Sequence, residues 1–192
     1  MSLVPAFEIG VWNAWILMLY IPLHPLLMML IDKAVGTGGM SQKMASVPHN
    51  KTEKGTFYSS MAILLLLLIY SVFLPLKLGA IWFYIGLPIY VVGLTMFMIS
   101  IVNIATTPLG EPFAKGIYRY SRHPMSFFGF LTFIGVGIAS ASWVFLLFLI
   151  VYTILSFVTA IPEERLCLER FGDTYREYMN RTPRWIGIPK SG

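Results

Sequence analysis

Two short polar segments contain the residue types that could carry out chemistry. Arg122-His123-Pro124 stands at the start of an apolar stretch, and Glu163-Glu164 stands at the end of another. Adjacent carboxylates at the end of an apolar helix repel each other and lose hydration, so they need a partner. That partner is either a helix N-terminus or a basic side chain such as Arg119 or Arg122, or else a ligand with a cation or hydroxyl groups. The residues alone leave both readings open.

The histidines and the single cysteine do not predict a metal site. A metal needs three or four converging ligands, whereas His24, His49 and His123 are far apart in the chain and Cys167 has no second cysteine beside it. We therefore expect no metal. His24 is flanked by prolines inside an apolar stretch, which favours a kinked helix with one satisfied histidine. A polar path through the membrane is the alternative.

Common cofactor and nucleophile motifs are also absent from the sequence. The chain contains neither a G-x-x-x-x-G-K-[ST] phosphate loop nor a G-x-G-x-x-G turn after a strand, and it lacks the G-x-S-x-G elbow of serine hydrolases. Any cofactor must therefore be held by a different arrangement of residues.

The composition predicts an integral membrane protein. Of the 192 residues, 57% are hydrophobic and 12% are charged, whereas soluble domains are about 25% charged. A spanning helix needs about 20 apolar residues, and five apolar stretches stand out, at residues 11–31, 57–76, 81–104, 125–138 and 143–161. Little of the chain is left over. We predict one all-helical, polytopic membrane domain over residues 1–192, without a Rossmann domain, a disulfide framework or a separate soluble domain.

The last two stretches are predicted to form a tight helical hairpin. Only residues 139–142 separate them, and the small residues Gly135, Gly137, Ala139 and Ala141 would allow two helix backbones to approach closely. Such a hairpin brings the two polar segments to the same membrane surface.

The tail beyond the hairpin is predicted to form an amphipathic helix. Proline is favoured in the first turn of a helix, so we expect a new helix to begin at Pro162. Its apolar side chains recur at helical spacing, at Leu168, Phe171, Tyr175 and Tyr178. We expect this helix to lie on the membrane or to pack on the bundle.

The basic residues predict the orientation of the chain. With five spans, 13 of the 14 Lys and Arg residues lie on one side and only Lys77 lies on the other. The positive-inside rule then places the N-terminus outside and the C-terminus and polar segments in the cytosol. The net charge of +5 is explained by insertion, so we expect no nucleic-acid partner. The loop 32–55 is either a linker or a lid, and the short chain favours a prokaryotic cytoplasmic membrane.

Together the polar segments form an ordered pattern. The pattern runs G-x-Y-x-x-x-R-H-P from Gly116 to Pro124, then the hairpin, then Glu163-Glu164, then F-G-x-x-Y-x-x-Y from Phe171 to Tyr178. It resembles the isoprenylcysteine carboxyl methyltransferase family, within the wider group that includes phospholipid methyltransferases. The resemblance covers residues 103–185, close to half of the chain.

The resemblance implies a membrane enzyme that uses S-adenosyl-L-methionine, yields S-adenosyl-L-homocysteine, and has no Rossmann fold. We expect Arg122 and Glu163 to act in catalysis. Carried over by position, the cofactor contacts are Tyr118, His123, Pro124, Met125, Ser126, Glu163 and Glu164, together with Asn103, Glu111, Pro112 and Phe113. Two positions depart from the family. Ser126 stands where an aromatic residue is common, and Thr159 stands where an arginine is proposed to contact the substrate.

The acceptor is expected to be a lipophilic molecule that enters from the bilayer. A carboxylate needs no general base, whereas an amine must first lose a proton. Because no base is obvious beyond His123 and the glutamates, the sequence favours methylation of a prenylated cysteine carboxylate, with phospholipid N-methylation as the alternative. Two other functions compete with methyl transfer. One is an NADPH-dependent membrane reductase of the steroid-reductase type, and the other is a non-enzymatic scaffold or small transporter.

Overall fold

The computed structural model describes residues 7–35 and 50–190. Within these residues, every element of secondary structure longer than an isolated bridge is a helix. The helices are α1 (Trp15–Met18), α2 (Tyr20–Val35), α4 (Lys51–Val72), α5 (Ile81–Thr106), α6 (Pro124–Ala139) and α7 (Trp143–Arg181), with a 3-10 turn η1 at Gly116–Arg119. An isolated bridge joins Asn13 to Pro75. The prediction of an all-helical protein is confirmed.

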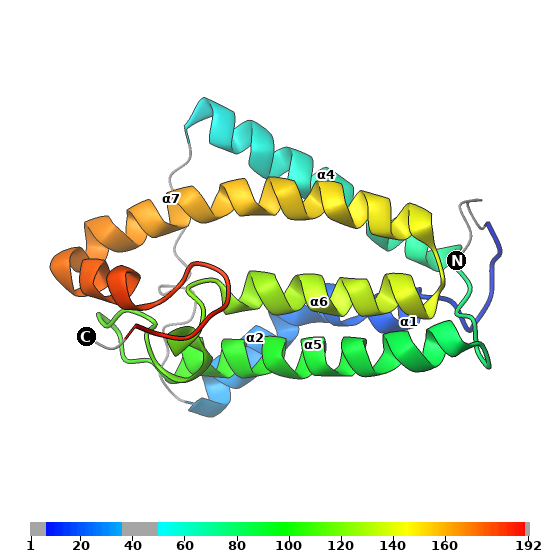
Figure 1. Ribbon diagram of the computed structural model, residues 1–192, viewed down its shortest axis with the longest axis horizontal. Helices are drawn as coiled ribbons and strands as arrows, with labels where there is room; N and C mark the ends of the chain where they lie inside the picture. Colours follow the sequence, from blue (N-terminus) through cyan, green and yellow to red (C-terminus); the bar gives the residue numbers. More distant parts are fainter. Residues whose placement is uncertain (1–6, 36–49, 191–192) are drawn as a thin grey trace.

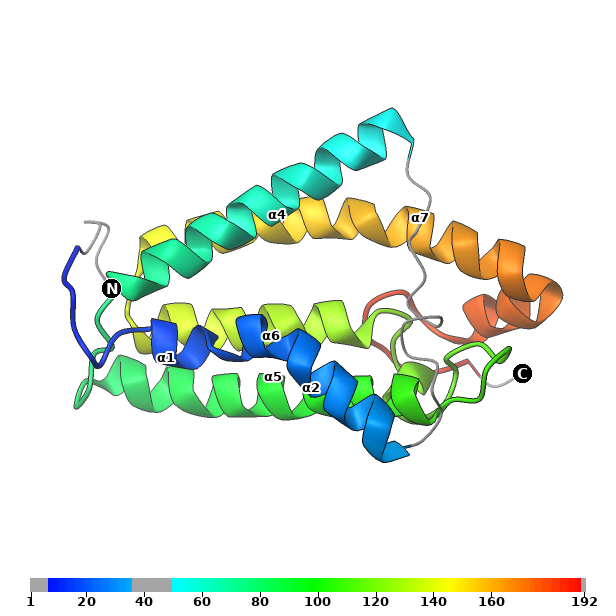
Figure 2. The same cartoon turned by 180° about the vertical axis from the view of Figure 1, so that it is seen from behind.

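The helices are arranged in two long pairs. α5 and α6 lie side by side, α4 crosses α7 above them, and α1 and α2 run across the α5–α6 pair (Figures 1 and 2). Glycines determine how closely α5 and α6 approach. A Cβ atom on Gly93 would lie 2.6 Å from the backbone nitrogen of Thr132, and a Cβ on Gly135 would clash with the backbone of Tyr90. Gly135 therefore serves the contact of α6 with α5, whereas the sequence placed it between α6 and α7.

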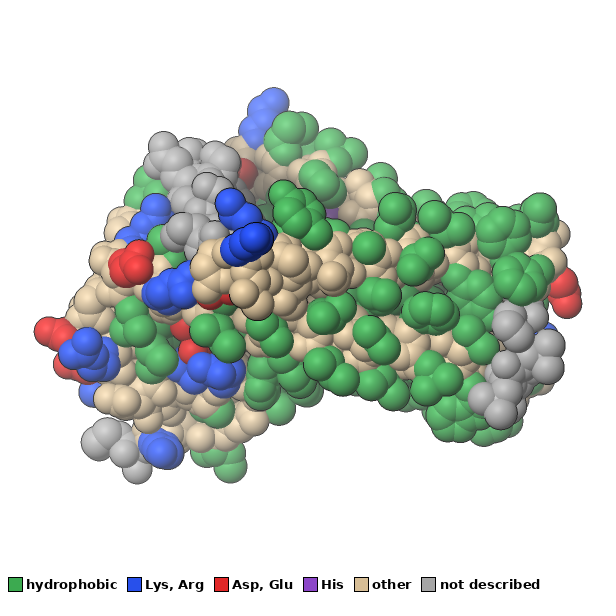
Figure 3. Space-filling model, turned by 90° about the horizontal axis from the view of Figure 1, so that it is seen from above, with side chains coloured by type: hydrophobic (Ala, Val, Ile, Leu, Met, Phe, Trp, Pro, Cys, Tyr) green, Lys and Arg blue, Asp and Glu red, His purple; other side chains and the backbone are tan. Residues whose placement is uncertain are grey.

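The outer surface is that of a membrane protein. Four helices are long and apolar enough to span a bilayer, namely Trp15–Val35, Lys51–Val72, Ile81–Thr106 and Trp143–Arg181, and Pro124–Ala139 is a shorter apolar helix. Hydrophobic side chains cover most of the length of the molecule, while charged side chains gather toward the end that carries the C-terminus (Figure 3). The molecule is a multi-pass integral membrane protein.

The second span begins earlier than the hydropathy pattern predicts. α4 starts at Lys51 because Asn50 and Glu53 form a capping box. The Asn50 side chain accepts a hydrogen bond from Glu53 N at 2.9 Å, and the Glu53 carboxylate accepts one from Asn50 N at 2.8 Å. Residues 32–35 and 51–55 of the expected loop are thus helical, and residues 36–49 lie outside the described part of the chain.

The prediction that a new helix begins at Pro162 is wrong. α7 continues through Pro162, where the helix lacks one backbone donor. The interruption instead falls at Gly172, whose φ of 53° and ψ of −127° are accessible to glycine. There the chain turns back toward the bundle (Figure 1). Tyr175 and Tyr178 of the expected stripe are buried against it.

Candidate functional site

His123 joins the two polar segments, as the predicted hairpin implies. It precedes Pro124, the first residue of α6. Its Nδ1 atom lies 3.3 Å from Glu163 Oε2, and its Nε2 atom lies 3.1 Å from Glu164 Oε1. Its backbone N–H points to Ser121 Oγ at 3.1 Å and to the carbonyl oxygen of Arg184 at 3.3 Å. Both the backbone and the ring of His123 are therefore held in place.

Glu164 is the buried centre of a charged cluster. It is 4% exposed and lies past Ile161, where the apolar part of α7 ends. Arg184 donates to it from Nη2 at 2.6 Å and from Nε at 3.1 Å. Arg122 Nε lies 3.4 Å from Glu164 Oε1, without hydrogen-bond geometry to any described residue. With His123 as its third partner, this carboxylate is fully engaged by protein groups.

The electrostatics of the cluster favour charged forms of both coupled residues. Burial alone would raise the pKa of Glu164, but hydrogen bonds from His123 and Arg184 and the charge of Arg122 lower it to about 2. Burial alone would lower the pKa of His123, but its hydrogen bonds to Glu163 and Glu164 and their negative charges raise it above its ordinary value. The cluster is therefore a set of compensated charges.

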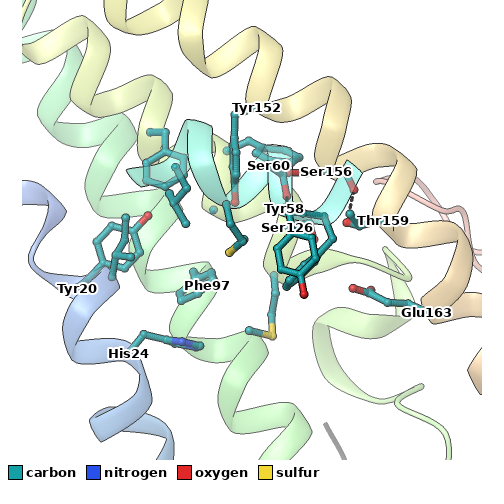
Figure 4. Close-up of a pocket in the computed structure, with 18 of the residues that line it drawn as sticks. Tyr20, His24, Tyr58, Ser60, Phe97, Ser126, Tyr152, Ser156, Thr159 and Glu163 are labelled. Carbon is teal, nitrogen blue, oxygen red and sulfur yellow. Dashed lines mark hydrogen bonds between the residues drawn. The ribbon is translucent and has the colours of Figure 1, made fainter. Parts of the chain in front are cut away.

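Glu163 is in a different environment from Glu164. Its side chain is 49% exposed, and His123 is its ion-pair partner among the described residues. It lines one end of a cavity of about 670 Å³ (Figure 4). Of the two adjacent glutamates, Glu163 is the one that can reach a ligand.

The cavity lies between five helices and is mainly apolar. Its walls come from α2, α4, α5, α6 and α7, and they include the aromatic side chains of Tyr20, Phe57, Tyr58, Phe97, Phe130, Phe133 and Tyr152. Polar side chains are spread along it (Figure 4), at His24, Ser60, Ser126, Ser156, Thr159 and Glu163, and Lys54 also lines it. This combination suits a long apolar molecule that carries a polar head.

Some of the predicted site residues line this cavity, and others are buried beside it and do not belong to its lining. Met125, Ser126 and Glu163 line it. Pro124 is buried as the first residue of α6. Tyr118 is buried, and its carbonyl oxygen accepts a hydrogen bond of 2.7 Å from the hydroxyl of Tyr178.

The segment before η1 is mostly structural. Asn103 Oδ1 accepts a hydrogen bond of 3.1 Å from Ile117 N, which fixes the turn. Phe113 packs on Tyr118, with ring centroids 6.0 Å apart. Glu111 forms an exposed ion pair of 3.0 Å with Lys115. Pro112 lines a separate pocket of about 420 Å³. The structure does not bring Glu111 and Pro112 to the main cavity.

Two residues of the site were missed in the sequence. Arg184 is the strongest partner of Glu164, and Trp185 packs on His123 and on Phe157, with ring centroids 5.7 Å and 4.0 Å away. They are brought back to α6 because Arg122 N and His123 N donate to the carbonyl oxygens of Pro183 and Arg184. The sequence feature that could have indicated them is the pair of adjacent carboxylates, because two carboxylates need more than one cationic partner. Within residues 7–35 and 50–190, no group of His, Cys, Asp and Glu could hold a metal ion.

The comparisons with known proteins agree with this architecture. The model of the phospholipid methyltransferase family matches residues 78–174, just over half of the chain. The matched interval contains α5, α6 and the part of α7 that carries both glutamates. Searches of curated proteins and of solved structures give no match. On the strength of the family match, the chain belongs to the phospholipid methyltransferase family.

Proposed function

We propose that this protein, as one membrane domain, transfers a methyl group from S-adenosyl-L-methionine to the polar head of a lipid at the cytosolic side of the bilayer. The observation that carries the proposal is the half-exposed Glu163 carboxylate at the end of a large apolar cavity. The family match supports the type of reaction. When bound, S-adenosyl-L-methionine supplies an electrophilic methyl group beside a cationic sulfur.

The residues at the cytosolic end of the cavity fit this cofactor. Glu163 can accept hydrogen bonds from its ammonium group or its ribose hydroxyls, and Met125 and Ser126 line the adjoining wall. His123 holds the Glu163 carboxylate at 3.3 Å. Because Glu164 is occupied by Arg184 and His123, we assign it, with Arg122, to positioning the site. The other predicted contacts stay assigned by resemblance.

The position of Glu163 supports the amine of a phospholipid as the methyl acceptor. A carboxylate beside an apolar cavity attracts an ammonium group, and a Glu163 oxygen that the cofactor does not engage can take the proton that an amine must lose before it forms a bond to carbon. The acceptor nitrogen must also be dehydrated and aligned, and the mainly apolar walls of the cavity favour its dehydration. The family description points to the same class of acceptor.

A second candidate acceptor is the carboxylate of a prenylated cysteine. Lys54 lines the same cavity from the first turns of α4 and could pair with a carboxylate. This acceptor needs no base, and the order R-H-P, hairpin, E-E resembles the enzymes that use it. The two candidates differ in the head group that Glu163 or Lys54 would contact.

Titration calorimetry on the detergent-purified protein tests the proposal. We expect S-adenosyl-L-homocysteine to bind saturably and NADPH, titrated separately, not to bind. Labelled methyl transfer to phosphatidylethanolamine and to farnesylcysteine then identifies the acceptor. Binding of NADPH alone would indicate a reductase instead. If neither ligand binds to folded protein, the methyltransferase proposal is refuted.

A further inference from the structure

His24 is a polar residue in the wall of the cavity, well away from Glu163. It lies in the second turn of α2, and its ring packs on Phe97 of α5 with centroids 5.6 Å apart (Figure 4). Its Nε2 atom is buried and has no hydrogen-bond partner among the residues that the structure describes. The sequence favoured a satisfied histidine at this position, and the structure differs from that expectation.

A buried nitrogen without a partner destabilises a protein by itself. Removing such a group from water without a replacement hydrogen bond costs about 1–3 kcal/mol. Tyr20 and Ser60 line the cavity as well, but neither hydroxyl forms a hydrogen bond with His24 Nε2 among the described residues. A group that enters the cavity can supply this partner.

The depth of His24 can be read from its neighbours. Phe97 lies level with Gly129 of α6, since a Cβ atom on Gly129 would be 3.9 Å from the Phe97 ring. Gly129 is six residues beyond His123, which corresponds to about 9 Å along a helix. The His24 ring, which packs on Phe97, is therefore about 9 Å further into the bilayer than His123, the ion-pair partner of Glu163.

The spacing discriminates between the two acceptors. In a glycerophospholipid, a glycerophosphate bridge separates an amine head group from ester carbonyl oxygens, which accept hydrogen bonds. In a prenylated cysteine, the thioether sulfur is close to the carboxylate and the chain beyond it is hydrocarbon. We propose that His24, in the tautomer with the proton on Nε2, donates a hydrogen bond to an ester carbonyl of a glycerolipid acceptor. This inference rests on the proposed function for the placement of the head group.

Lipid binding measured without the cofactor tests the proposal. Native mass spectrometry of the purified protein would compare diacyl phosphatidylethanolamine with its diether analogue, which lacks the ester carbonyls. The variants are His24→Phe, which keeps the ring shape, and His24→Gln, which keeps a donor. Met61→Leu alters an apolar wall residue of the same cavity and serves as the control. Calorimetry with S-adenosyl-L-homocysteine, run in parallel, reports on the proposed function separately.

We expect the wild type to bind the diester about tenfold more tightly than the diether, the effect of one buried hydrogen bond. His24→Phe should abolish this preference, while His24→Gln and Met61→Leu retain it. His24→Phe should melt no lower than the wild type, because Nε2 of His24 has no hydrogen-bond partner among the described residues. Equal binding of the two lipids by the wild type overturns the proposal, and this comparison requires no variant. The proposal is also overturned if His24→Phe keeps the preference for the diester over the diether, or if the protein binds farnesylcysteine tightly and neither glycerolipid.

Discussion

At the scale of single residues, the two adjacent glutamates lie in opposite environments, and we propose different roles for them. Glu164 is 4% exposed and held by Arg184, Arg122 and His123, whereas the side chain of Glu163 is 49% exposed and faces the cavity. The sequence shows only that two carboxylates need partners. Which of them points into the charged cluster depends on the rotation of α7 and on the return of the C-terminal segment.

Substituting each glutamate by glutamine separates the two roles. Glu163→Gln should lower the affinity for S-adenosyl-L-homocysteine about tenfold or more, because a charged hydrogen-bond acceptor is lost, with little change in melting temperature. Glu164→Gln should instead destabilise the fold by about 3 kcal/mol, because the buried guanidinium of Arg122 would lose its compensating charge and Arg184 would lose its carboxylate partner. Calorimetry and thermal unfolding in the same detergent measure both effects. Equal losses of affinity without loss of stability would contradict the assignment.

The protonated form of His123 should make stability depend on pH. Its pKa is raised in the folded protein by the two glutamates, so its contribution is complete below the unfolded pKa of about 6.5 and is lost as pH rises through the folded pKa. We expect the melting temperature to fall above neutral pH. The His123→Asn variant provides the matched control, and a fall of the same size in this variant would assign the effect to another group.

At the scale of elements, the sequence predicts the helices better than it predicts their interruptions. The five apolar stretches and the hairpin follow from hydropathy and chain length, because a bilayer requires them. The position at which α7 is interrupted does not follow from hydropathy, because it depends on whether the helix breaks at its proline or at its glycine. Pro162 is buried and stays helical, while Gly172 takes the positive φ. Arg184 and Trp185 were missed because only this turn brings them to His123.

Two glycines with open space around them should respond to alanine in opposite ways. No atom lies within 4 Å of a Cβ built on Gly172 or on Gly55, so packing does not distinguish them. Gly172→Ala should destabilise by about 1–3 kcal/mol, because its φ of 53° and ψ of −127° strain any residue with a Cβ. Gly55→Ala, inside α4, should stabilise by up to about 1 kcal/mol. Thermal unfolding of both variants checks the signs, and two changes in the same direction would contradict this account.

At the scale of the whole molecule, the apolar surface and the charged end determine how the protein sits in a membrane. Lys and Arg side chains gather toward one end of the molecule (Figure 3), which is the end where the chain terminates (Figure 1). Arg122 and Arg184 pair with Glu164 in the charged cluster. The cavity ends near this cluster, so a water-soluble cofactor would reach it from the same side as the basic residues. The function proposed here therefore requires that side to be the cytosol.

Cysteine labelling tests the orientation directly. Cys167 is the only cysteine in the chain, so a Cys167→Ser background accepts single reporters. Lys77→Cys lies in the turn between α4 and α5, and Lys190→Cys lies in the C-terminal segment. The expected five-span topology puts 13 of the 14 basic residues on one side, and the positive-inside rule then predicts that Lys190 lies in the cytosol. In intact bacterial cells, a membrane-impermeant maleimide should label Lys77→Cys and should label Lys190→Cys only after the membrane is opened. The reverse pattern would place the cluster outside the cell, where S-adenosyl-L-methionine is not supplied, and would refute the proposed reaction together with the topology.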